Sequence, residues 1–500
     1  MRPYLISMAA MFLGTGCTHA ASLDRWVPVR WSGGPLEIAR RAAVKPISQE
    51  LTVALGDWYQ PWSLDLLRDT PVNCLLVPWS GGGDAAVESR QQQAVREYAG
   101  EAHKRGIAVM GLVTSAGGAA LAATAAAEAG LDGLALDGEF ADAGQLADAM
   151  SRLARNKGHE LPVITLPSKT GSAPGVRLFT EGGAVQATPT SEPWIDSNIW
   201  LVRSMRARGP EAAWLGYPLE KPSGDDYVRA IADADAAGGR WVVSLDDSLL
   251  VGLATKRPEA LLLWRRIGST LQFFEEHAAW RSFAPTGPLG IVRDPSIADA
   301  DMAAENQNLI ARRKIPYRLL DRSAPAWPGL EGFQAVLAIG CSLDEAEKEA
   351  LRKFAARGGL AIVGPAWGVA VPQDKDFELR IEGKGRIAIY REDTPEPEAL
   401  SKDVLYLLGK GNLGVRLFHA LTVLPAVSES TGGRQLLVQM VNYATEPAET
   451  VTVRLDGEYR TARLYGLDGV STQLALEKSE RGTEVKIPRI PVYAALVLER

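Results

Sequence analysis

The sequence predicts an α/β protein in which a TIM barrel is followed by a flavodoxin-like α/β domain and an antiparallel β-sandwich. Short apolar runs alternate with helical stretches from about residue 50, which is typical of β/α units around a parallel sheet. A second α/β pattern follows a break at SFAPTGP (282–288), and alternating strands follow from about residue 411. We therefore expect a barrel over 22–284, a flavodoxin-like domain over 285–408 and a sandwich over 409–500.

The barrel prediction depends on eight strand candidates that follow one another along the chain. They are LTVALGDW (51–58), VNCLLVPW (72–79), IAVMGLVT (107–114), LDGLALDGE (131–139), LPVITLP (161–167), AVQATPT (184–190), AAWLGYP (212–218) and RWVVSLDD (240–247). Eight strand-helix units in about 230 residues have the size of a TIM barrel. VRLFTEGG competes with the sixth candidate, and a doubly wound open sheet is the alternative fold.

The two later domains are predicted from their own patterns. PLGIVRD, IPYRLLD, FQAVLAIG and GLAIVGP are strand candidates with helices between them, whereas RQLLVQMVNYA, ETVTVRLD and AALVLER belong to the sandwich. Cys341 follows a strand in AIGCSLDE, which resembles the nucleophile elbow of glutamine amidotransferases without its flanking Gly-x-Cys-x-Gly pattern, and no suitable base accompanies it. We interpret this domain as a spacer or an oligomerisation element.

The N-terminus and the charge balance bear on location and partners. MRPYLISMAAMFLGTGCTHA (1–20) has the features of an export signal over residues 1–21, and LGTGC resembles a bacterial lipoprotein signal. Either Cys17 is lipidated and anchors the protein to a membrane, or the signal is cleaved near Ala20 or Ala21. We expect a periplasmic or cell-surface protein.

The 54 basic and 60 acidic residues are well mixed, so a nucleic-acid partner is not expected.

The order of barrel, flavodoxin-like domain and sandwich resembles the architecture of family 42 β-galactosidases. In that family the middle domain helps to build a trimer, so the resemblance implies an oligosaccharide or polysaccharide ligand and a homo-oligomer formed through the flavodoxin-like domain. The chain lacks the Asn-Glu pair that ends the fourth strand in that family.

The main catalytic candidates lie in LDGLALDGEF (131–140). Side chains two apart on a strand share a face, so Asp137 and Glu139 are expected to point together into the barrel mouth. Asp132 begins the strand, about 16 Å away, and is expected to be structural. Paired carboxylates are what glycosidic bond cleavage uses. The alternative is that these acids only end a buried strand.

This stretch resembles the signatures of two families. In the family 18 chitinase pattern, Glu139 would be the general acid and Asp137 would orient the substrate's acetamido group, although Ala135 stands where that motif has an aspartate. In the family 31 α-glucosidase pattern, Asp137 would be the nucleophile. The two resemblances therefore imply different roles for Asp137.

Other predicted strand ends supply partners for these acids. Asp196 and Asp246 are further catalytic candidates, while an N-cap is the alternative for each. The substrate-binding candidates are aromatic, acidic or amide side chains, which suit sugar rings and hydroxyl groups. They are Asp57, Trp58, Tyr59, Trp79, Trp194, Asn198, Tyr217, Glu220 and Asp247. A hydrophobic staple is the alternative for Trp194 and a solvated loop for Glu220.

The motif search favours carboxylate chemistry without a cofactor or a metal. The five histidines are scattered, and the sequence has neither a Gly-x-Gly-x-x-Gly turn between a strand and a helix nor a P-loop. Our leading hypothesis is an exported hydrolase of O-glycosyl bonds in carbohydrate metabolism. The alternatives are a non-catalytic glycan-binding protein on a degenerate barrel and, less specifically, a structural envelope protein.

Overall fold

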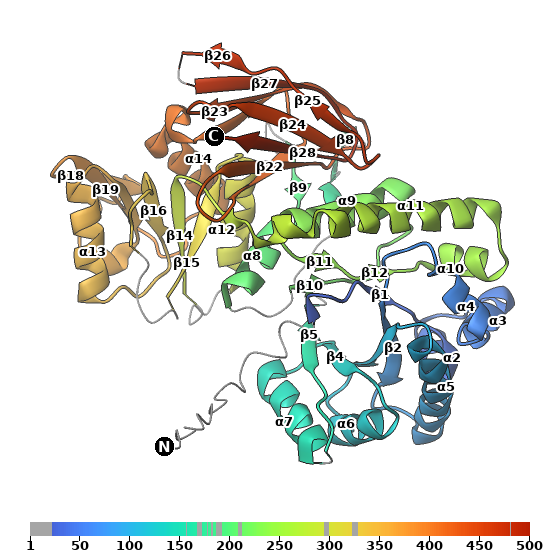
Figure 1. Cartoon of the computed structure of the whole chain (residues 1–500). Helices are drawn as coiled ribbons and strands as arrows, with labels where there is room; N and C mark the ends of the chain where they lie inside the picture. Colours follow the sequence, from blue (N-terminus) through green and yellow to red (C-terminus); the bar gives the residue numbers. More distant parts are fainter. Residues whose placement is uncertain are drawn as a thin grey trace, which may run out of the picture.

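The computed structural model describes residues 23–156, 158–167, 173–177, 179–181, 184–186, 193–208, 213–294, 300–322, 329–480 and 482–500. Three groups of strands are arranged around a central helical layer (Figure 1). The export segment and Cys17 lie outside the described residues, so both remain predictions. Among the residues described, no helix combines the length and the apolar composition that crossing a membrane requires.

The first group is a parallel half-barrel sheet. Its six strands run in the order β12-β1-β2-β3-β4-β5. Their bounds are β1 (Pro28–Arg30), β2 (Cys74–Ser80), β3 (Ala108–Val113), β4 (Gly133–Asp137), β5 (Val163–Leu166) and β12 (Val243–Ser244). A parallel pair, β10 (Trp214–Leu215) and β11 (Arg240–Trp241), adjoins β12 along the chain. The fold is therefore α/β and TIM-barrel-like.

The first predicted barrel strand is wrong. Residues 51–58 belong to helix α3 (Gln49–Gly56) and the turn after it, and Ser48 Oγ accepts a hydrogen bond from Leu51 N at the start of the helix. The buried residues are Leu51, Ala54, Leu55 and Trp58, which is helical spacing. The actual first strand, β1, has only three residues, which is too short for a periodic pattern to reveal it.

The sixth predicted strand is also wrong as a barrel strand. Its described part, β8 (Ala184–Gln186), pairs antiparallel with β7 (Phe179–Glu181), which lies in the competing run VRLFTEGG. Nearby, β6 (Gly175–Val176) pairs antiparallel with β9 (Ile195–Asp196). Among the described residues between β5 and β10, these two short pairs replace a parallel strand.

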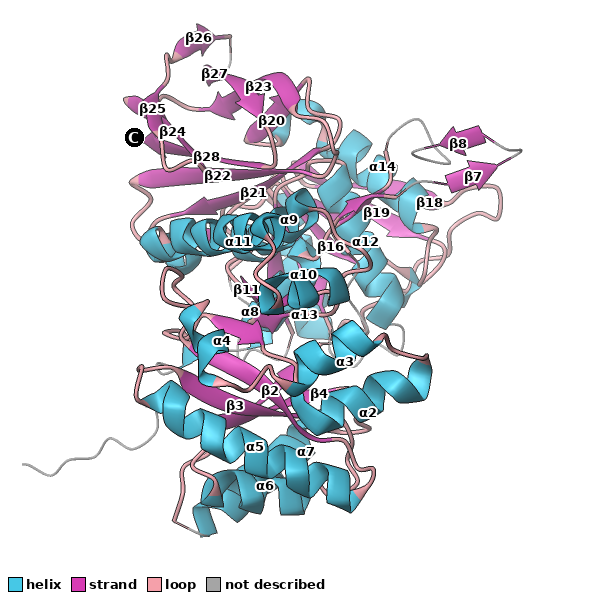
Figure 2. Cartoon of the chain, turned by 90° about the vertical axis from the view of Figure 1, so that its right-hand side faces the viewer, coloured by secondary structure: helices cyan, strands magenta, loops and turns pink. Residues whose placement is uncertain are grey.

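Helices cover the half-barrel on its outer side (Figure 2). Figure 2 shows α5, α6 and α7 beneath the sheet, while α9 and α11 lie between the barrel and the C-terminal strands. The helix bounds are α2 (Gly34–Val44), α4 (Pro61–Asp65), α5 (Ala85–His103), α6 (Ala119–Glu128), α7 (Ala143–Asn156), α8 (Ile199–Arg208), α9 (Gly224–Ala236), α10 (Asp247–Ala254) and α11 (Pro258–Glu276).

The middle sheet has the order β15-β14-β16-β17-β19-β18. The first five of these strands are parallel and follow the 2-1-3-4-5 order of flavodoxin-like sheets. The strands are β14 (Leu289–Arg293), β15 (Tyr317–Asp321), β16 (Ala335–Ala338), β17 (Leu360–Val363), β18 (Phe377–Glu382) and β19 (Gly385–Tyr390), and the helices are α12 (Ala300–Arg312), α13 (Glu345–Ala356) and α14 (Pro397–Leu408). The antiparallel edge strand β18 was not predicted from the sequence.

The C-terminal strands form two antiparallel sheets, β13-β21-β22-β28-β24-β25 and β20-β23-β27-β26. An apolar core fills the space between them. The strands are β13 (Ala284–Pro285), β20 (Val415–Phe418), β21 (Val423–Glu429), β22 (Gln435–Asn442), β23 (Ala448–Asp456), β24 (Thr461–Gly466), β25 (Ser471–Gln473), β26 (Glu477–Ser479), β27 (Gly482–Ile490) and β28 (Tyr493–Glu499).

The barrel and the C-terminal sheets share one continuous core. Leu437 and Tyr493 belong to the same buried cluster as Ile231 and Phe274 of the barrel helices. Arg229 of α9 also donates hydrogen bonds to the carbonyl of Asn442, the last residue of β22, and to the carbonyl of Ala444. The shared apolar cluster and these hydrogen bonds fix α9 and α11 against the outer face of β22 and β28.

Candidate functional site

The carboxyl ends of β1 and β4 meet at the mouth of the half-barrel. Arg30 ends β1 and Asp137 ends β4, and the guanidinium binds both carboxylate oxygens. Arg30 Nη2 lies 2.8 Å from Asp137 Oδ1 and also donates to the Gly216 carbonyl at 2.7 Å. The side chains are only 8% and 12% exposed. Asp137 therefore lies at the mouth, as predicted, in a fixed bidentate ion pair.

A second set of charges lies on helix α2, next to this pair. Glu37 is 2% exposed and accepts hydrogen bonds from Arg40 Nε at 2.9 Å and from Arg41 Nε at 2.6 Å. Burial by itself would raise the pKa of Glu37, but the two guanidinium groups outweigh burial and hold that pKa below its usual value. Arg41 also pairs with Asp247, which follows β12.

Electrostatic coupling joins the two sets of charges. The pKa of Arg40 is raised, first by its hydrogen bond to Glu37 and further by the negative charges of Asp137 and Asp247. We call Arg30, Glu37, Arg40, Arg41, Asp137 and Asp247 the mouth cluster. Its three arginines balance its three carboxylates. Sequence reasoning missed Glu37 and all three arginines because its first strand candidate began at residue 51, after these positions. The Glu-x-x-Arg-Arg spacing on α2 was the available signal.

The remaining predicted acids lie in different surroundings. Glu139 is exposed two residues beyond Asp137, and Glu220 is exposed in the loop after β10. Asp246 is the N-cap of α10: its Oδ1 accepts from Ser248 N at 2.8 Å and its Oδ2 from the Tyr227 hydroxyl at 2.8 Å. Asp246 is thus structural here, and its neighbour Asp247 belongs to the mouth cluster.

Trp194 packs against Arg312 of helix α12, and Asp196 pairs with Arg177. Arg177 binds both oxygens of Asp196, at 2.9 Å each. The Arg312 guanidinium of α12 lies 3.7 Å from the centroid of the Trp194 ring, and Arg177 lies 5.9 Å from it. The ring is therefore part of a packed contact between chain segments, and the predicted roles of catalytic helper and sugar platform are not supported by this position.

Asn198 and Tyr217 belong to a buried network with Asp233 of α9. Asn198 Nδ2 donates to the Tyr217 hydroxyl at 3.0 Å and to Asp233 Oδ2 at 3.1 Å. The Tyr443 hydroxyl, from the segment after β22, donates to the other oxygen of Asp233. Burial raises the pKa of Asp233, although these hydrogen bonds oppose the rise. The network connects the barrel to the C-terminal sheets rather than forming an open subsite.

The predicted aromatic platforms are mostly core residues. Trp58 and Trp79 are fully buried, and Trp79 Nε1 donates to the Ala122 carbonyl at 2.9 Å. The Tyr59 hydroxyl donates to the Trp31 carbonyl at 3.1 Å, and burial raises the pKa of Tyr59. A buried ring offers no free face for stacking, so the sugar-binding prediction is wrong for Trp58 and Trp79.

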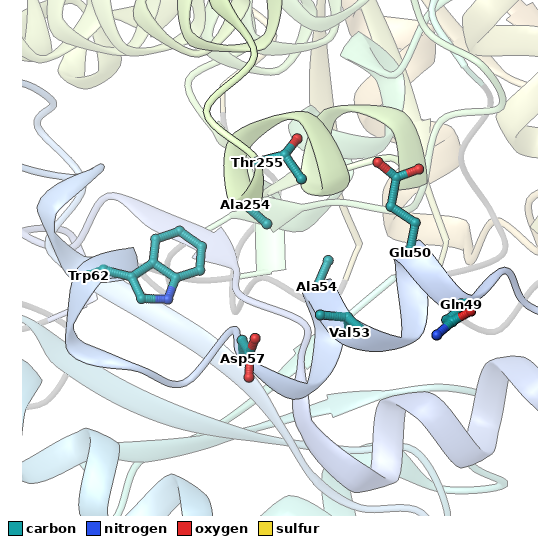
Figure 3. A pocket seen from close by; sticks show the side chains of 8 residues that line it. All are labelled: Gln49, Glu50, Val53, Ala54, Asp57, Trp62, Ala254 and Thr255. Atoms are coloured by element: carbon teal, nitrogen blue, oxygen red, sulfur yellow. The ribbon is translucent and has the colours of Figure 1, made fainter.

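Asp57 lines an open groove of about 570 Å³ between α3 and the end of α10 (Figure 3). Figure 3 shows the Trp62 ring at one end of the groove and Glu50 at the other. The remaining lining residues are Gln49, Val53, Ala54, Ala254 and Thr255. Helix α10 runs from the mouth cluster to this groove. Asp247 at its first position belongs to the mouth cluster, and Ala254 at its last position lines the groove, about 10 Å further along the helix axis. Within the described part of the chain, no three His, Cys, Asp or Glu side chains are grouped as metal ligands.

Comparisons with known proteins give a fold but no family. No protein-family model and no curated sequence matches the chain. Among solved structures, α-L-fucosidase isoenzyme 2 from Paenibacillus thiaminolyticus matches 95% of this chain and 99% of its own, with a TM-score of 0.59 at 11% identity. An exo-β-1,4-mannosidase from Opitutaceae bacterium strain TAV5 covers 77% of this chain and 97% of its own, with a TM-score of 0.47 at 13% identity.

A family 42 β-galactosidase from G. stearothermophilus covers 84% of this chain and 68% of its own, with a TM-score of 0.33 at 11% identity. Of these three structures, the fucosidase alone has a TM-score above 0.5, and at 11% identity its likeness shows the fold alone. The chain thus has a glycoside hydrolase-like fold in which a TIM-barrel-like sheet is followed by further sheets.

Proposed function

We propose that this protein is a glycoside hydrolase that acts at the mouth cluster, with Asp137 as the carboxylate that attacks or stabilises the sugar carbon. The observation that carries the proposal is the bidentate Arg30–Asp137 pair at the carboxyl end of β4. An arginine bound to both oxygens fixes the direction of the carboxylate. A carboxylate held in this way suits a nucleophile and not a proton donor. Of the two family resemblances, this role agrees with the α-glucosidase pattern.

The reaction also needs a proton donor. Glu139 lies two residues beyond Asp137 and is exposed to solvent. In the proposed sequence, Glu139 protonates the departing glycosidic oxygen while Asp137 bonds to the sugar carbon, and water, deprotonated by Glu139, then releases the sugar and restores both groups.

The test is hydrolysis of a panel of aryl glycosides and oligosaccharides, beginning with the α-L-fucoside, β-mannoside and β-galactoside suggested by the similar structures. Asp137→Asn should abolish turnover of a cleaved substrate. Glu139→Gln should lower the rate about 10²–10⁴-fold on poor leaving groups and less on activated aryl groups, which need little protonation. Glu449→Gln, an exposed acid on strand β23 of the C-terminal sheets, is the matched control. Full activity of folded Asp137→Asn contradicts the assignment.

A non-catalytic glycan-binding protein is the second candidate. It is favoured by the balanced mouth cluster, in which every carboxylate is engaged by an arginine. The groove lined by Trp62 offers a partly exposed ring, and Asp57 and Glu50 line the same groove. Binding of a polysaccharide without any hydrolysis, measured by calorimetry on the same panel, would favour this candidate.

We also propose export to the periplasm or the cell surface, as the sequence of residues 1–21 suggests. Cell fractionation and metabolic labelling with palmitate test it. Lipidation predicts a labelled protein whose label is lost in Cys17→Ala. Simple cleavage predicts a soluble exported protein that carries no label.

A further inference from the structure

Strand β18 (Phe377–Glu382) is an uncovered edge of the middle sheet. Figure 1 shows it at the left margin of the molecule, and among the described strands it pairs with β19 alone. Apolar side chains on this strand face solvent: Ile381 is 82% exposed and Leu379 is 43% exposed. An exposed edge with apolar side chains is a template for pairing with another strand.

The hairpin geometry defines which backbone groups are available. Glu382 and Gly385 flank the two-residue turn between β18 and β19 and pair directly with each other. Such a closing pair exchanges both hydrogen bonds, and the pattern then alternates along the strand. The N–H and C=O groups of Phe377, Leu379 and Ile381 therefore point away from β19.

The side chains of β18 are complementary to a second copy in one antiparallel register. With a two-fold axis at Leu379, Phe377 lies opposite Ile381 of the copy and Glu378 lies opposite Arg380 of the copy. Two opposite-charge pairs and three apolar pairs result, with six backbone hydrogen bonds from the three outward-pointing residues. Within one chain, Glu378 and Arg380 already lie on the same face, since Arg380 Nε donates to Glu378 Oε1 at 2.9 Å.

The flanking helices leave room for this pairing. Strands in a sheet are about 4.8 Å apart, so β19 and its symmetry mate would be about 14 Å apart. A helix with its side chains is about 10–12 Å wide. Helix α13 packs mainly over β19 and β17 and touches β18 less extensively, so its axis lies inward from the edge. The two copies of α13 therefore fit side by side.

We infer that β18 pairs with β18 of a second copy, antiparallel about a two-fold axis at Leu379, and so joins two middle sheets into one. The self-complementary register favours a second copy over an unrelated strand. The geometry gives a dimer, which differs from the trimer that the family 42 resemblance implied. This surface is independent of the mouth cluster and of the proposed hydrolase activity.

Sedimentation equilibrium of the full chain tests the inference by charge reversal. The wild type should have twice the chain mass. Glu378→Arg places two like-charge pairs across the axis and should weaken the dimer about tenfold or more, as should Arg380→Glu. The double variant Glu378→Arg/Arg380→Glu restores opposite charges and should restore the dimer. Glu449→Arg is the matched control, because Glu449 pairs with Arg489 across two exposed strands elsewhere.

A cross-link tests the register directly. Residues that exchange both hydrogen bonds across an antiparallel pair have Cα atoms about 5.5 Å apart, within the range of a disulfide. Leu379→Cys should therefore give a covalent dimer under mild oxidation. Cys74 and Cys341 are buried, and the wild type controls for any other thiol. A monomeric or trimeric wild type, or charge reversals that leave the mass unchanged, would overturn the inference.

Discussion

Replacing Arg30 by methionine tests whether the mouth cluster is held together by a buried ion pair. The substitution removes two guanidinium contacts to Asp137 and one hydrogen bond to the Gly216 carbonyl, while it keeps much of the side-chain volume. The two side chains are 8% and 12% exposed, so water replaces the lost partners poorly. Removing one partner of a buried pair costs about 3–5 kcal/mol, and we expect that loss in the free energy of unfolding.

Urea denaturation at neutral pH measures this loss, and two variants act as controls. Arg257→Met removes an ion pair with Glu50 whose side chains are 43% and 52% exposed, and it should cost at most about 1 kcal/mol. The double variant Arg30→Met/Asp137→Leu also removes the buried Asp137 carboxylate that Arg30→Met leaves without its partner. It should therefore be more stable than Arg30→Met. If Arg30→Met costs no more than Arg257→Met, the pair is solvated and the reasoning fails.

Three further predictions concern stability. Burial raises the pKa of Asp235 to about 6, although the charge of Arg281 opposes the rise. Between about pH 4 and 6 the folded protein therefore holds a proton on Asp235 that the unfolded chain has lost. The free energy of unfolding falls as pH rises through this range. Asp235→Asn should remove this fall, on the order of 3 kcal/mol, so its stability relative to wild type should increase between pH 4 and 7 in urea titrations. Trp58→Ala should cost about 3–5 kcal/mol by thermal or urea unfolding, since the ring is fully buried against Trp31 and Trp62; a loss below 1 kcal/mol would contradict this packing. Asp246→Ala should cost about 0.5–2 kcal/mol through the lost cap of α10 while any glycosidase activity persists; an abolished activity in the folded variant would instead make Asp246 catalytic.

The sequence predicted best those parts of the fold that have a strong local pattern. β2 is buried along its whole length, so its continuous apolar run identified it, and β3 and β4 were found in the same way. The position of Asp137 at the end of β4 followed directly. Asp132 was also placed correctly at the other end, where it accepts from Val109 N and contacts His103.

The sequence was a poor guide where a short or mixed segment is defined by its neighbours. The three residues of β1 carry no period of their own and become a strand by pairing with β2 and β12. The apolar residues of α3 look like a strand when read in order, yet they are buried at helical intervals. Aromatic residues near predicted strand ends were expected to face a ligand, whereas Trp58 and Trp79 complete the core.

The sequence by itself determined which segments have the apolar periodicity to become buried strands and helices, because that property depends on neighbouring residues. Only the tertiary structure decided which charges meet. Arg30 and Asp137 are 107 positions apart, and Arg41 and Asp247 are 206 apart. The curvature of the parallel sheet brings the ends of β1, β4 and β12 to one mouth, and no local pattern encodes that proximity.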